Sequence, residues 1–509
     1  MFNLTPLLKT YTWQRTKKIN SQDPALVQEC QLKKLLSIAS QTEFGKLHDF
    51  KKISTIKEYQ SVVPLRRYED FWRDFWQSSF PRISGISWPT PIKYFAVSSG
   101  TSSGRTKYIP ISREMLDSNK QAGLDLLTHH LNNKPQSQIF GGKSFFLGGS
   151  TDLAVEAEGI VSGDLSGIAV KNLPWWARLR YYPPAELALL KNWEEKIEKL
   201  ASGSLQEDIR MISGVPSWLL IFFKKVFEFK KASPKLANCY PNLELLVHGG
   251  VNFANYQKTF HSLLEGSNAE LREVYPASEG FIAIADRGPG EGLRLILDHG
   301  IFFEFVPLEE LEKSNPTRHW LGNIQKEINY AVILTTCAGL WSYILGDTVK
   351  FIDLNPPRLL ITGRTSYYLS AFGEHLTGDE IEKAISLAAD AINKEVAEFS
   401  VTPVYPAKEG EKGGHLFIVE FRDSLPSKEE IVAFESELLK KLCTLNEDYE
   451  AHYANGFGLK APVVKITASG SFNTWMKNRG KLGGQNKVPR VILDQELWRS
   501  LESATINKN

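Results

Sequence analysis

The chain has 509 residues, of which 42% are hydrophobic and 23% are charged, as in an ordinary globular protein. This length predicts two or more domains. Sixty Lys and Arg residues against 58 Asp and Glu residues leave a net charge of +2, so no strong field favours a nucleic-acid or membrane partner.

The cysteines and the N-terminus exclude further classes of protein. Cys30, Cys239, Cys337 and Cys443 lie far apart with no C-x-x-C pair, which disfavours a structural zinc site and a disulfide framework. The segment "MFNLTPLLKTYTWQRTKK" lacks a signal-peptide core, and no run of about 18 apolar residues could span a bilayer. We therefore expect a soluble cytoplasmic protein without a nucleic-acid or membrane partner.

The first part of the chain is predicted to be mostly helical. Apolar residues in "PALVQECQLKKLLSIAS" recur at helical spacing. A loop rich in serine and glycine, residues 98–104, follows between the β-like segments "PIKYFAV" and "TKYIPIS". Two helical stretches, "AELALLKNWEEKIEKLAS" and "PSWLLIFFKKVFEF", come before residue 240.

Strand signals dominate from residue 240 to Arg364. "LELLVHGG" has the apolar run of a buried strand, and "LRLILDHGIFFEFVP" predicts a hairpin that turns at Asp298, His299 and Gly300. Further strands are expected in "AVILTT", "YILGDTVKFIDL" and "PRLLITGR".

The pattern changes after Arg364. Thr377 with Glu380 and Ser427 with Glu430 have the spacing of capping boxes at the start of two helices. Strands are expected in "SVTPVY", "HLFIVEF" and "APVVKITAS". We therefore predict an α/β fold in which residues 1–366 form a large α/β domain with mixed sheets and residues 367–509 a small α+β domain.

The serine-rich loop allows two chemical readings. One is a hydrolase, since residues 100–104 fit G-x-S-x-G with Ser102 as the nucleophile. A nucleophile elbow, however, turns directly into a helix, and here a β-like segment with Pro110 follows. The expected oxyanion loop also precedes the serine, whereas the HGG at residues 248–250 comes much later.

The other reading is a cradle for a polyphosphate. Backbone N–H groups of a glycine-permitted turn form a concave site for anionic oxygens. Hydroxyl groups of Ser98, Ser99, Thr101 and Ser102 would add donors without bulk, and Arg105 or Lys107 would help to neutralise the phosphates.

Three later motifs favour the cradle. In "VYPASEGFIA", which we expect to follow a helix, Glu279 suits Mg²⁺ beside phosphate oxygens, and Tyr275 suits stacking on a purine or lining the pocket. In "YILGDTVKF" the carboxylate of Asp347, expected in a turn, suits the two ribose hydroxyls. In "GGQNKVPR" Lys487 follows a glycine pair.

Together these motifs resemble the adenylate-forming enzymes, specifically the Gretchen Hagen (auxin-responsive promoter) family of acyl acid amido synthetases. "SSGTSSGRTKYIP" resembles the phosphate loop of the family, "VYPASEG" its second nucleotide motif, "YILGDTVKF" its Tyr-Arg-x-Gly-Asp ribose motif, and "NEDYEAHYANGFGLKAP" with "GGQNKVPR" its C-terminal pattern. Two departures stand out: Ile344 replaces the usual Arg, and Glu374-His375 replace an Asp-Lys pair of plant members.

The resemblance implies a nucleotide- and acid-binding N-terminal domain of the adenylate-forming type and a small, mobile C-terminal domain that closes over the active site. It implies that ATP and Mg²⁺ are the cofactors, and that a carboxylic acid becomes an acyl-adenylate before transfer to an amine. An amino acid is the amine that the resemblance suggests. Lys487 and Glu279 would be catalytic, with Glu279 also the Mg²⁺ ligand. The expected nucleotide contacts are Ser98, Ser99, Gly100, Thr101, Ser102, Gly249, Gly250, Tyr275, Ser278, Glu279, Asp347 and Arg364.

Three alternatives stay open at this point. A thioester-forming ligase would share the adenylation step and differ in its acceptor. A silent nucleotide-binding protein would release no pyrophosphate, and a serine hydrolase would use Ser102. The sequence identifies neither the acid nor the amine.

Overall fold

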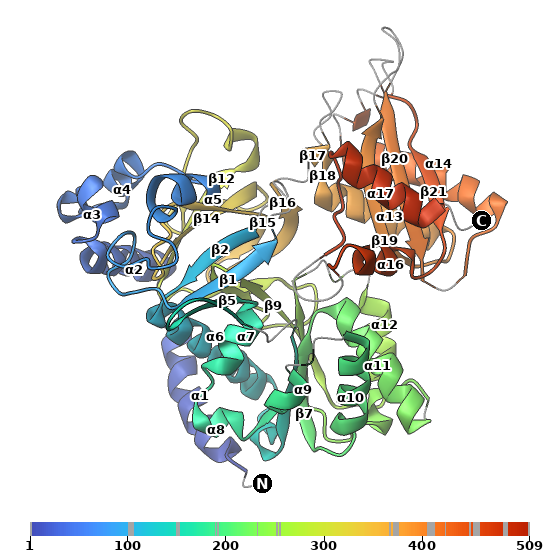
Figure 1. The fold of residues 1–509 in the computed structure, drawn as a ribbon, viewed down its shortest axis with the longest axis horizontal. Coiled ribbons are helices and arrows are strands. Elements are labelled where there is room, and N and C mark those ends of the chain that lie inside the picture. Colours follow the sequence, from blue (N-terminus) through green and yellow to red (C-terminus); the bar gives the residue numbers. More distant parts are fainter. Residues whose placement is uncertain are drawn as a thin grey trace. The chain divides into compact units, whose positions relative to one another are not determined.

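The computed structural model describes residues 3–99, 106–148, 153–188, 190, 193–231, 233–250, 253, 256–365, 368–369, 376–404, 413–422, 424–446, 449–450, 453, 459–481 and 487–506. The chain forms two compact units, Met1–Ile361 and Thr362–Asn509, each with its own hydrophobic core (Figure 1). That the two units correspond to the expected functional domains stays a prediction. Among the described residues, no helix combines the length and the apolar character that a membrane span requires.

A large mixed sheet runs through the first unit. The strand order is β13-β12-β14-β15-β16-β11-β10-β9-β8-β7-β3-β6 among the described residues. Neighbours from β6 to β9 are parallel, whereas β9 pairs with β10 in the antiparallel sense. The turn after β9 therefore lies at the carboxyl edge of the parallel strands, where α/β sheets bind ligands.

The strands of this sheet are mostly buried, as expected for a sheet covered on both faces. Their bounds are β3 (Lys143–Leu147), β6 (Tyr181–Tyr182), β7 (Ile209–Gly214), β8 (Leu245–Gly249), β9 (Glu270–Ala277), β10 (Gly280–Ile284), β11 (Leu293–Leu295), β12 (Ile301–Pro307), β13 (His319–Trp320), β14 (Asn329–Thr336), β15 (Tyr343–Leu354) and β16 (Pro357–Arg364).

A smaller sheet has the strand order β2-β1-β5-β4. Its strands are β1 (Tyr94–Ser99), β2 (Thr106–Ile111), β4 (Ala154–Ala157) and β5 (Ile160–Gly163). Strands β1 and β2 pair in the antiparallel sense from Tyr94↔Ile111 to Ser99↔Thr106, so the serine-rich loop connects two arms of a hairpin.

Helices surround these sheets. Local sequence explains where several of them begin: the Asp23 side chain accepts from the Leu26 N–H at 2.9 Å, and the Ser112 hydroxyl accepts from the Met115 N–H at 3.0 Å. The helices are α1 (Thr5–Asn20), α2 (Pro24–Ala39), α3 (Glu43–Leu47), α4 (Ile56–Val62), α5 (Tyr68–Phe71), α6 (Arg113–Asn133), α7 (Leu165–Lys171), α8 (Trp175–Arg178), α9 (Ala185–Ala188), α10 (Trp193–Ser204), α11 (Pro216–Lys230) and α12 (Gln257–Leu264).

The second unit is an α+β domain around a sheet of order β19-β20-β21. Helices α13 and α14 pack on the face that carries Phe417 and Val419, whereas α16 and α17 pack on the face of Ile418. The elements are β17 (Tyr368–Leu369), β18 (Leu376–Thr377), α13 (Gly378–Ala391), β19 (Val396–Val404), β20 (Gly414–Phe421), α14 (Lys428–Leu445), β21 (Val463–Thr467), α16 (Ser471–Asn478) and α17 (Gln495–Ile506). The sequence had indicated only the first two of these helices.

Three local expectations are wrong. Strand β11 pairs with β10 and β16, and β12 pairs with β13 and β14, so residues 293–307 do not form a hairpin. The segment before "PASEG" is strand β9 rather than a helix. Asp347 lies inside strand β15 rather than in a turn between strands. In each case pairing with strands elsewhere in the chain overrides the local signal.

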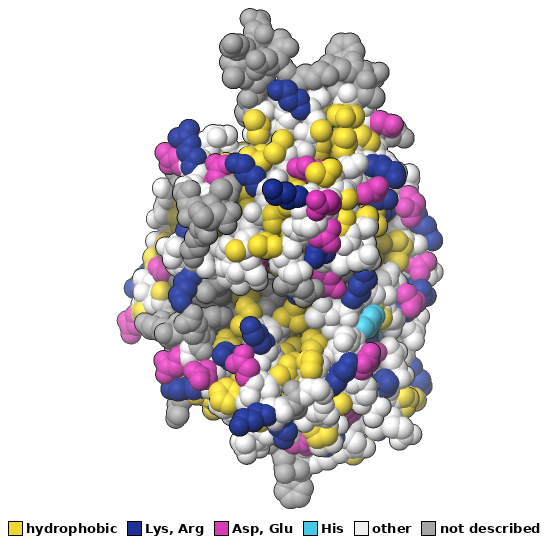
Figure 2. Space-filling view, turned by 90° about the vertical axis from the view of Figure 1, so that its right-hand side faces the viewer, with side chains coloured by type: hydrophobic (Ala, Val, Ile, Leu, Met, Phe, Trp, Pro, Cys, Tyr) yellow, Lys and Arg dark blue, Asp and Glu magenta, His cyan; other side chains and the backbone are white. Residues whose placement is uncertain are grey.

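On the face that Figure 2 shows, neither positive nor negative side chains dominate. Lys and Arg side chains alternate there with Asp and Glu side chains. This distribution agrees with the net charge of +2.

Candidate active site

The turn between β9 and β10 carries the acidic residue of the second motif. Ser278 and Glu279 are 9% and 8% exposed. The next residue, Gly280, has φ +156°, a backbone conformation that L side chains rarely adopt, so another residue would strain the turn. The backbone therefore fixes Glu279 at the carboxyl edge of the parallel strands.

A tyrosine orients this carboxylate. The Tyr343 hydroxyl donates to Glu279 Oε1 at 3.0 Å. Burial raises the pKa of Glu279, the charge of Asp347 adds to this effect, and the hydrogen bond from Tyr343 opposes it. A buried carboxylate with a raised pKa fits a divalent cation, because the cation would stabilise the ionised form.

A second tyrosine orients Asp347. The Tyr275 hydroxyl donates to Asp347 Oδ2 at 2.7 Å, and the two side chains are 4% and 8% exposed. The β14–β15 register shifts opposite Asp347, where Gly346 has φ +91°. The bulge thus aims Asp347 at Tyr275, and the expected stacking of Tyr275 on a purine stays a prediction.

The base of the serine-rich loop lies near Glu279. The main chain pairs Ser98 with Lys107 and Ser99 with Thr106. The positive charge of Lys107 acts on Glu279, against the larger effect of burial on the pKa of that carboxyl group. Gly100, Thr101 and Ser102 lie outside the described residues.

The glycine pair after β8 is required by the backbone. A Cβ at Gly249 would collide with the carbonyl oxygen of Val274 on β9, and Gly250 has φ +83°. Both glycines lie next to the end of β9, on the edge that carries Glu279. Contact with a nucleotide stays a prediction for both.

Two predicted site residues belong to the second unit. Arg364 ends β16, and Lys487 is exposed outside any helix or strand. Three residues after Lys487, Arg490 forms ion pairs with Glu382 and Glu398, which fixes this segment to the second unit. Glu374 and His375 lie outside the described residues.

A buried polar network behind Tyr343 was not found from the sequence. The Ser342 hydroxyl donates to Glu304 Oε2 at 3.0 Å and accepts from Arg318 Nη2 at 2.6 Å. Ser342 itself has φ +45°, a conformation that such contacts must stabilise. The available signal was the tyrosine that opens the ribose motif, but the partners of Ser342 lie far away in sequence.

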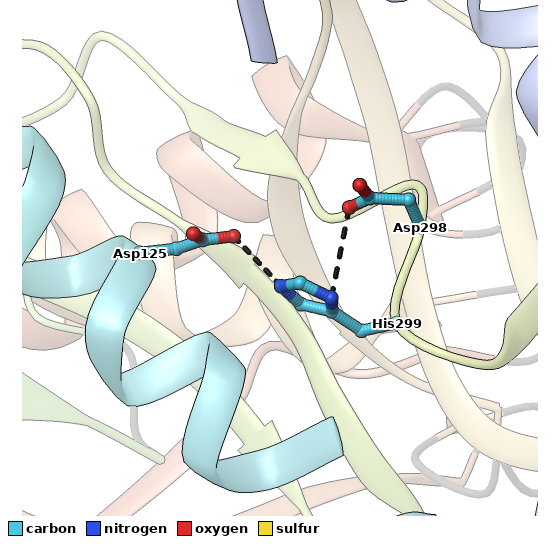
Figure 3. A group of neighbouring side chains, drawn as sticks. All are labelled: Asp125, Asp298 and His299. Carbon is cyan, nitrogen blue, oxygen red and sulfur yellow. Dashed lines mark hydrogen bonds and ion pairs between the residues drawn. The ribbon is translucent and has the colours of Figure 1, made fainter. Parts of the chain in front are cut away.

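Asp125, Asp298 and His299 form a separate acidic cluster between α6 and the loop before β12 (Figure 3). Their ligand atoms lie within 4.8 Å of one another, which would suit a metal ion. The guanidinium group of Arg15 already donates to both carboxylates through four hydrogen bonds of 2.7 Å. Arg15 thus supplies the positive charge, and we interpret the cluster as structural.

Comparison with protein families gives a consistent result along most of the chain. The GH3 family N-terminal domain matches residues 17–269, the GH3 family central domain residues 294–364, and the GH3 family C-terminal domain residues 379–496. The chain belongs to the GH3 family. The resemblance to the Gretchen Hagen family that the motifs indicated is thereby confirmed.

Two relatives illustrate how distant the similarity is in sequence. The chain is 22% identical over 560 residues to the indole-3-acetic acid-amido synthetase GH3.4 of Arabidopsis thaliana, covering 96% of this chain and 92% of that protein. It is 19% identical over 547 residues to the jasmonoyl–L-amino acid synthetase JAR4 of Nicotiana attenuata, covering 93% and 92%.

Solved structures confirm the fold class. The GH3.15 acyl acid amido synthetase superimposes with a TM-score of 0.79 at 16% identity, covering 100% of this chain and 97% of that one. A 2-hydroxyisobutyryl-CoA ligase gives a TM-score of 0.61 at 15% identity, covering 94% and 90%. This chain therefore shares its fold with both of these proteins.

We expect Tyr343→Phe to raise the Mg²⁺ concentration for half-maximal pyrophosphate exchange by about tenfold, since a hydrogen bond to a charged group contributes roughly 1.5–3 kcal/mol. Loss of the hydroxyl also raises the pKa of Glu279 further, so the defect should grow as the pH falls. Titrations of Mg²⁺ at several pH values measure both effects. Tyr330→Phe, another buried tyrosine of the sheet, is the control, and an equal effect there would contradict the role of Tyr343.

We expect Asp347→Asn to weaken ATP binding by roughly 1.5–3 kcal/mol, with a smaller effect on the acid. If Asp347 binds the ribose, the variant should also discriminate poorly between ATP and its deoxy analogues. Michaelis constants for these nucleotides test this. Discrimination equal to that of the parent would make Asp347 a purely structural partner of Tyr275.

Proposed function

We propose that the protein is an ATP-dependent acyl acid amido synthetase, a ligase that forms a C–N bond. An oxygen of the substrate carboxylate attacks the α-phosphate of ATP, and pyrophosphate leaves with the electron pair of the broken P–O bond. The amine then attacks the acyl carbon, AMP leaves, and the nitrogen loses a proton. The substrates would be a small carboxylic acid and an amino acid.

The observation that carries this proposal is the match of three GH3 family domains in order along the chain. The pair of buried carboxylates, Glu279 and Asp347, each oriented by a tyrosine, supports it. Such groups suit a reaction in which the protein mainly aligns the reactants and compensates charge.

We assign Mg²⁺ to Glu279, with Lys107 as a further positive group near the phosphates. The ion would neutralise phosphate charge when bound. The hydroxyl-rich loop after Ser99 would bind the triphosphate, and Ser102 would act there as a hydrogen-bond donor. We also propose a cytoplasmic location, which agrees with the free thiols of all four cysteines.

The hydrolase alternative loses support from the structure around the loop. The segment after the loop is strand β2, paired in the antiparallel sense with β1. A nucleophile elbow needs a helix at this point. Labelling of Ser102 by a fluorophosphonate would nevertheless refute the synthetase.

A crossed panel tests the proposed function. Carboxylic acids are combined with ATP and Mg²⁺ and screened for acid-dependent pyrophosphate exchange. Acids that respond are then offered amino acids or coenzyme A, and the products are identified by mass spectrometry. An amide supports the synthetase, a thioester alone supports the ligase alternative, and no exchange with any acid contradicts adenylation.

A further inference from the structure

Two ionisable side chains stand next to each other on strands β8 and β9, close to the candidate active site. The parallel register pairs His248 directly with Glu273. Side chains of paired residues in adjacent strands point to the same face of a sheet. Tyr275, the partner of Asp347, lies two residues after Glu273 and shares this face.

Neither side chain has a hydrogen-bond partner among the described residues. His248 is 2% exposed, its Nδ1 atom is buried without a partner, and its ring stacks on Phe253 at 3.6 Å. The carboxylate of Glu273 is half-buried and forms no ion pair in this part of the structure. A buried polar group without a hydrogen-bond partner lowers the stability of a folded protein. Such a group indicates a function when it lies at the edge of a sheet where ligands bind.

Small side chains flank Glu273 on the side of strand β10. On the other side of β9, strand β10 pairs Ala283 with Tyr275, and the Ala285 N–H donates to the Glu273 carbonyl oxygen at 2.9 Å. The two neighbours on this face, Ala283 of β10 and Ala285 directly after β10, are therefore alanines. His248, Tyr275 and these two alanines are the strand residues around the carboxylate.

We propose that Glu273 accepts the proton of the attacking amine in the second half-reaction, with His248 as a neighbouring hydrogen-bonding group for that nitrogen. This inference rests on the proposed synthetase activity. The amine nitrogen forms its bond to the acyl carbon, and the bond from that carbon to the phosphate oxygen breaks with its electrons on AMP. The proton released by nitrogen passes to the Glu273 carboxylate and then to solvent.

The protonation behaviour of both groups suits these roles. Burial raises the pKa of Glu273 to about 7, near the value at which a general base works best at neutral pH. Burial lowers the pKa of His248 to about 3, so its ring stays neutral and does not repel an incoming ammonium ion. Tyr275 is the other ionisable group on this face of β9 next to Glu273.

The test compares two acceptors on the Glu273→Gln variant, with an acid chosen from the panel. Hydroxylamine is largely uncharged at neutral pH and needs little help to lose a proton, whereas an amino acid enters as an ammonium ion. We expect amide formation with the amino acid to fall on the order of 10²-fold, the usual contribution of a general base. Hydroxamate formation should fall far less, and this also reports that the variant is folded.

The matched control is Glu270→Gln on the same strand. Glu270 is hydrogen-bonded to His130 and Asn133, which together with Arg272 lower its pKa to about 2 despite burial, so it is a much weaker base than Glu273. The pH profile of the parent should also show an acidic limb near pH 7 in the amide step that Glu273→Gln lacks.

The outcomes separate this proposal from the proposed function. Equal losses with both acceptors, or a loss of the same size in Glu270→Gln, would overturn the role of Glu273 alone. Unchanged amide formation in Glu273→Gln would do the same. Absence of pyrophosphate exchange in the parent protein would instead overturn the synthetase activity, and this proposal with it.

Discussion

Lys487→Ala is expected to lose pyrophosphate exchange on the order of 10²-fold, while amide formation from pre-made acyl-adenylate stays close to that of the parent. During adenylation, negative charge increases on the α-phosphate and on the departing pyrophosphate, and an ammonium group there stabilises it. In the second step pyrophosphate has already left, so this positive charge matters less. Separate assays of the two half-reactions measure the difference.

Lys440→Ala provides a control for loss of a lysine in the same unit. Its side chain is 67% exposed on α14. We expect this variant to match the parent in both half-reactions. Equal losses in both steps for Lys487→Ala would refute a step-specific role, and no loss in either would make Lys487 an ordinary surface lysine.

Arg15→Ala is expected to reduce the free energy of unfolding by about 3–5 kcal/mol, because it removes the buried guanidinium group that pairs with both carboxylates. Arg15, Asp125 and Asp298 have side chains that are 8%, 4% and 9% exposed. Denaturant unfolding at neutral pH measures the loss. A loss below about 1 kcal/mol would mean that another group replaces the guanidinium.

The pH dependence of this loss has a definite sign. Burial alone would raise the pKa of Asp125 and Asp298, but the hydrogen bonds from Arg15 lower both below their ordinary values. The parent therefore keeps this stabilisation above about pH 4, the ordinary pKa of Asp, and loses it as the pH falls through the folded-state values. The difference between parent and variant should thus shrink in acid.

Lys18→Ala is the control for the same cluster. Lys18 lies 3.0 Å from Asp298, but its side chain is 66% exposed. An exposed ion pair contributes roughly 0–1 kcal/mol, so we expect a small loss. A loss as large as that of Arg15→Ala would contradict the importance of burial.

Local sequence predicted those features that depend on local chemistry. Ser427 and Glu430 form the expected capping box of α14, in which each side chain accepts from the backbone N–H of the other. The strands before and after the serine-rich loop are β1 and β2, as their β-branched and aromatic residues indicated. Family motifs located Glu279 and Asp347 because each is defined by its immediate neighbours.

Long-range pairing accounts for what the sequence did not predict. The Gly346-Asp347 pair is typical of a turn, but pairing with β14 makes it a bulge within one strand. Tyr343 and Glu279 are 64 residues apart, and Tyr275 and Asp347 are 72 apart. No local pattern specifies which tyrosine meets which carboxylate, since the order of strands in the sheet decides it.

The ion pairs of Arg15 with Asp125 and Asp298 also constrain when the first unit can finish folding during synthesis. One carboxylate partner of Arg15, Asp298, follows it 283 residues later in the chain. At roughly 5–20 residues per second, translation takes about 15–60 s to cover that distance. Helix α1 must therefore remain without its ion pair to Asp298 on the ribosome until the segment with Asp298 has emerged.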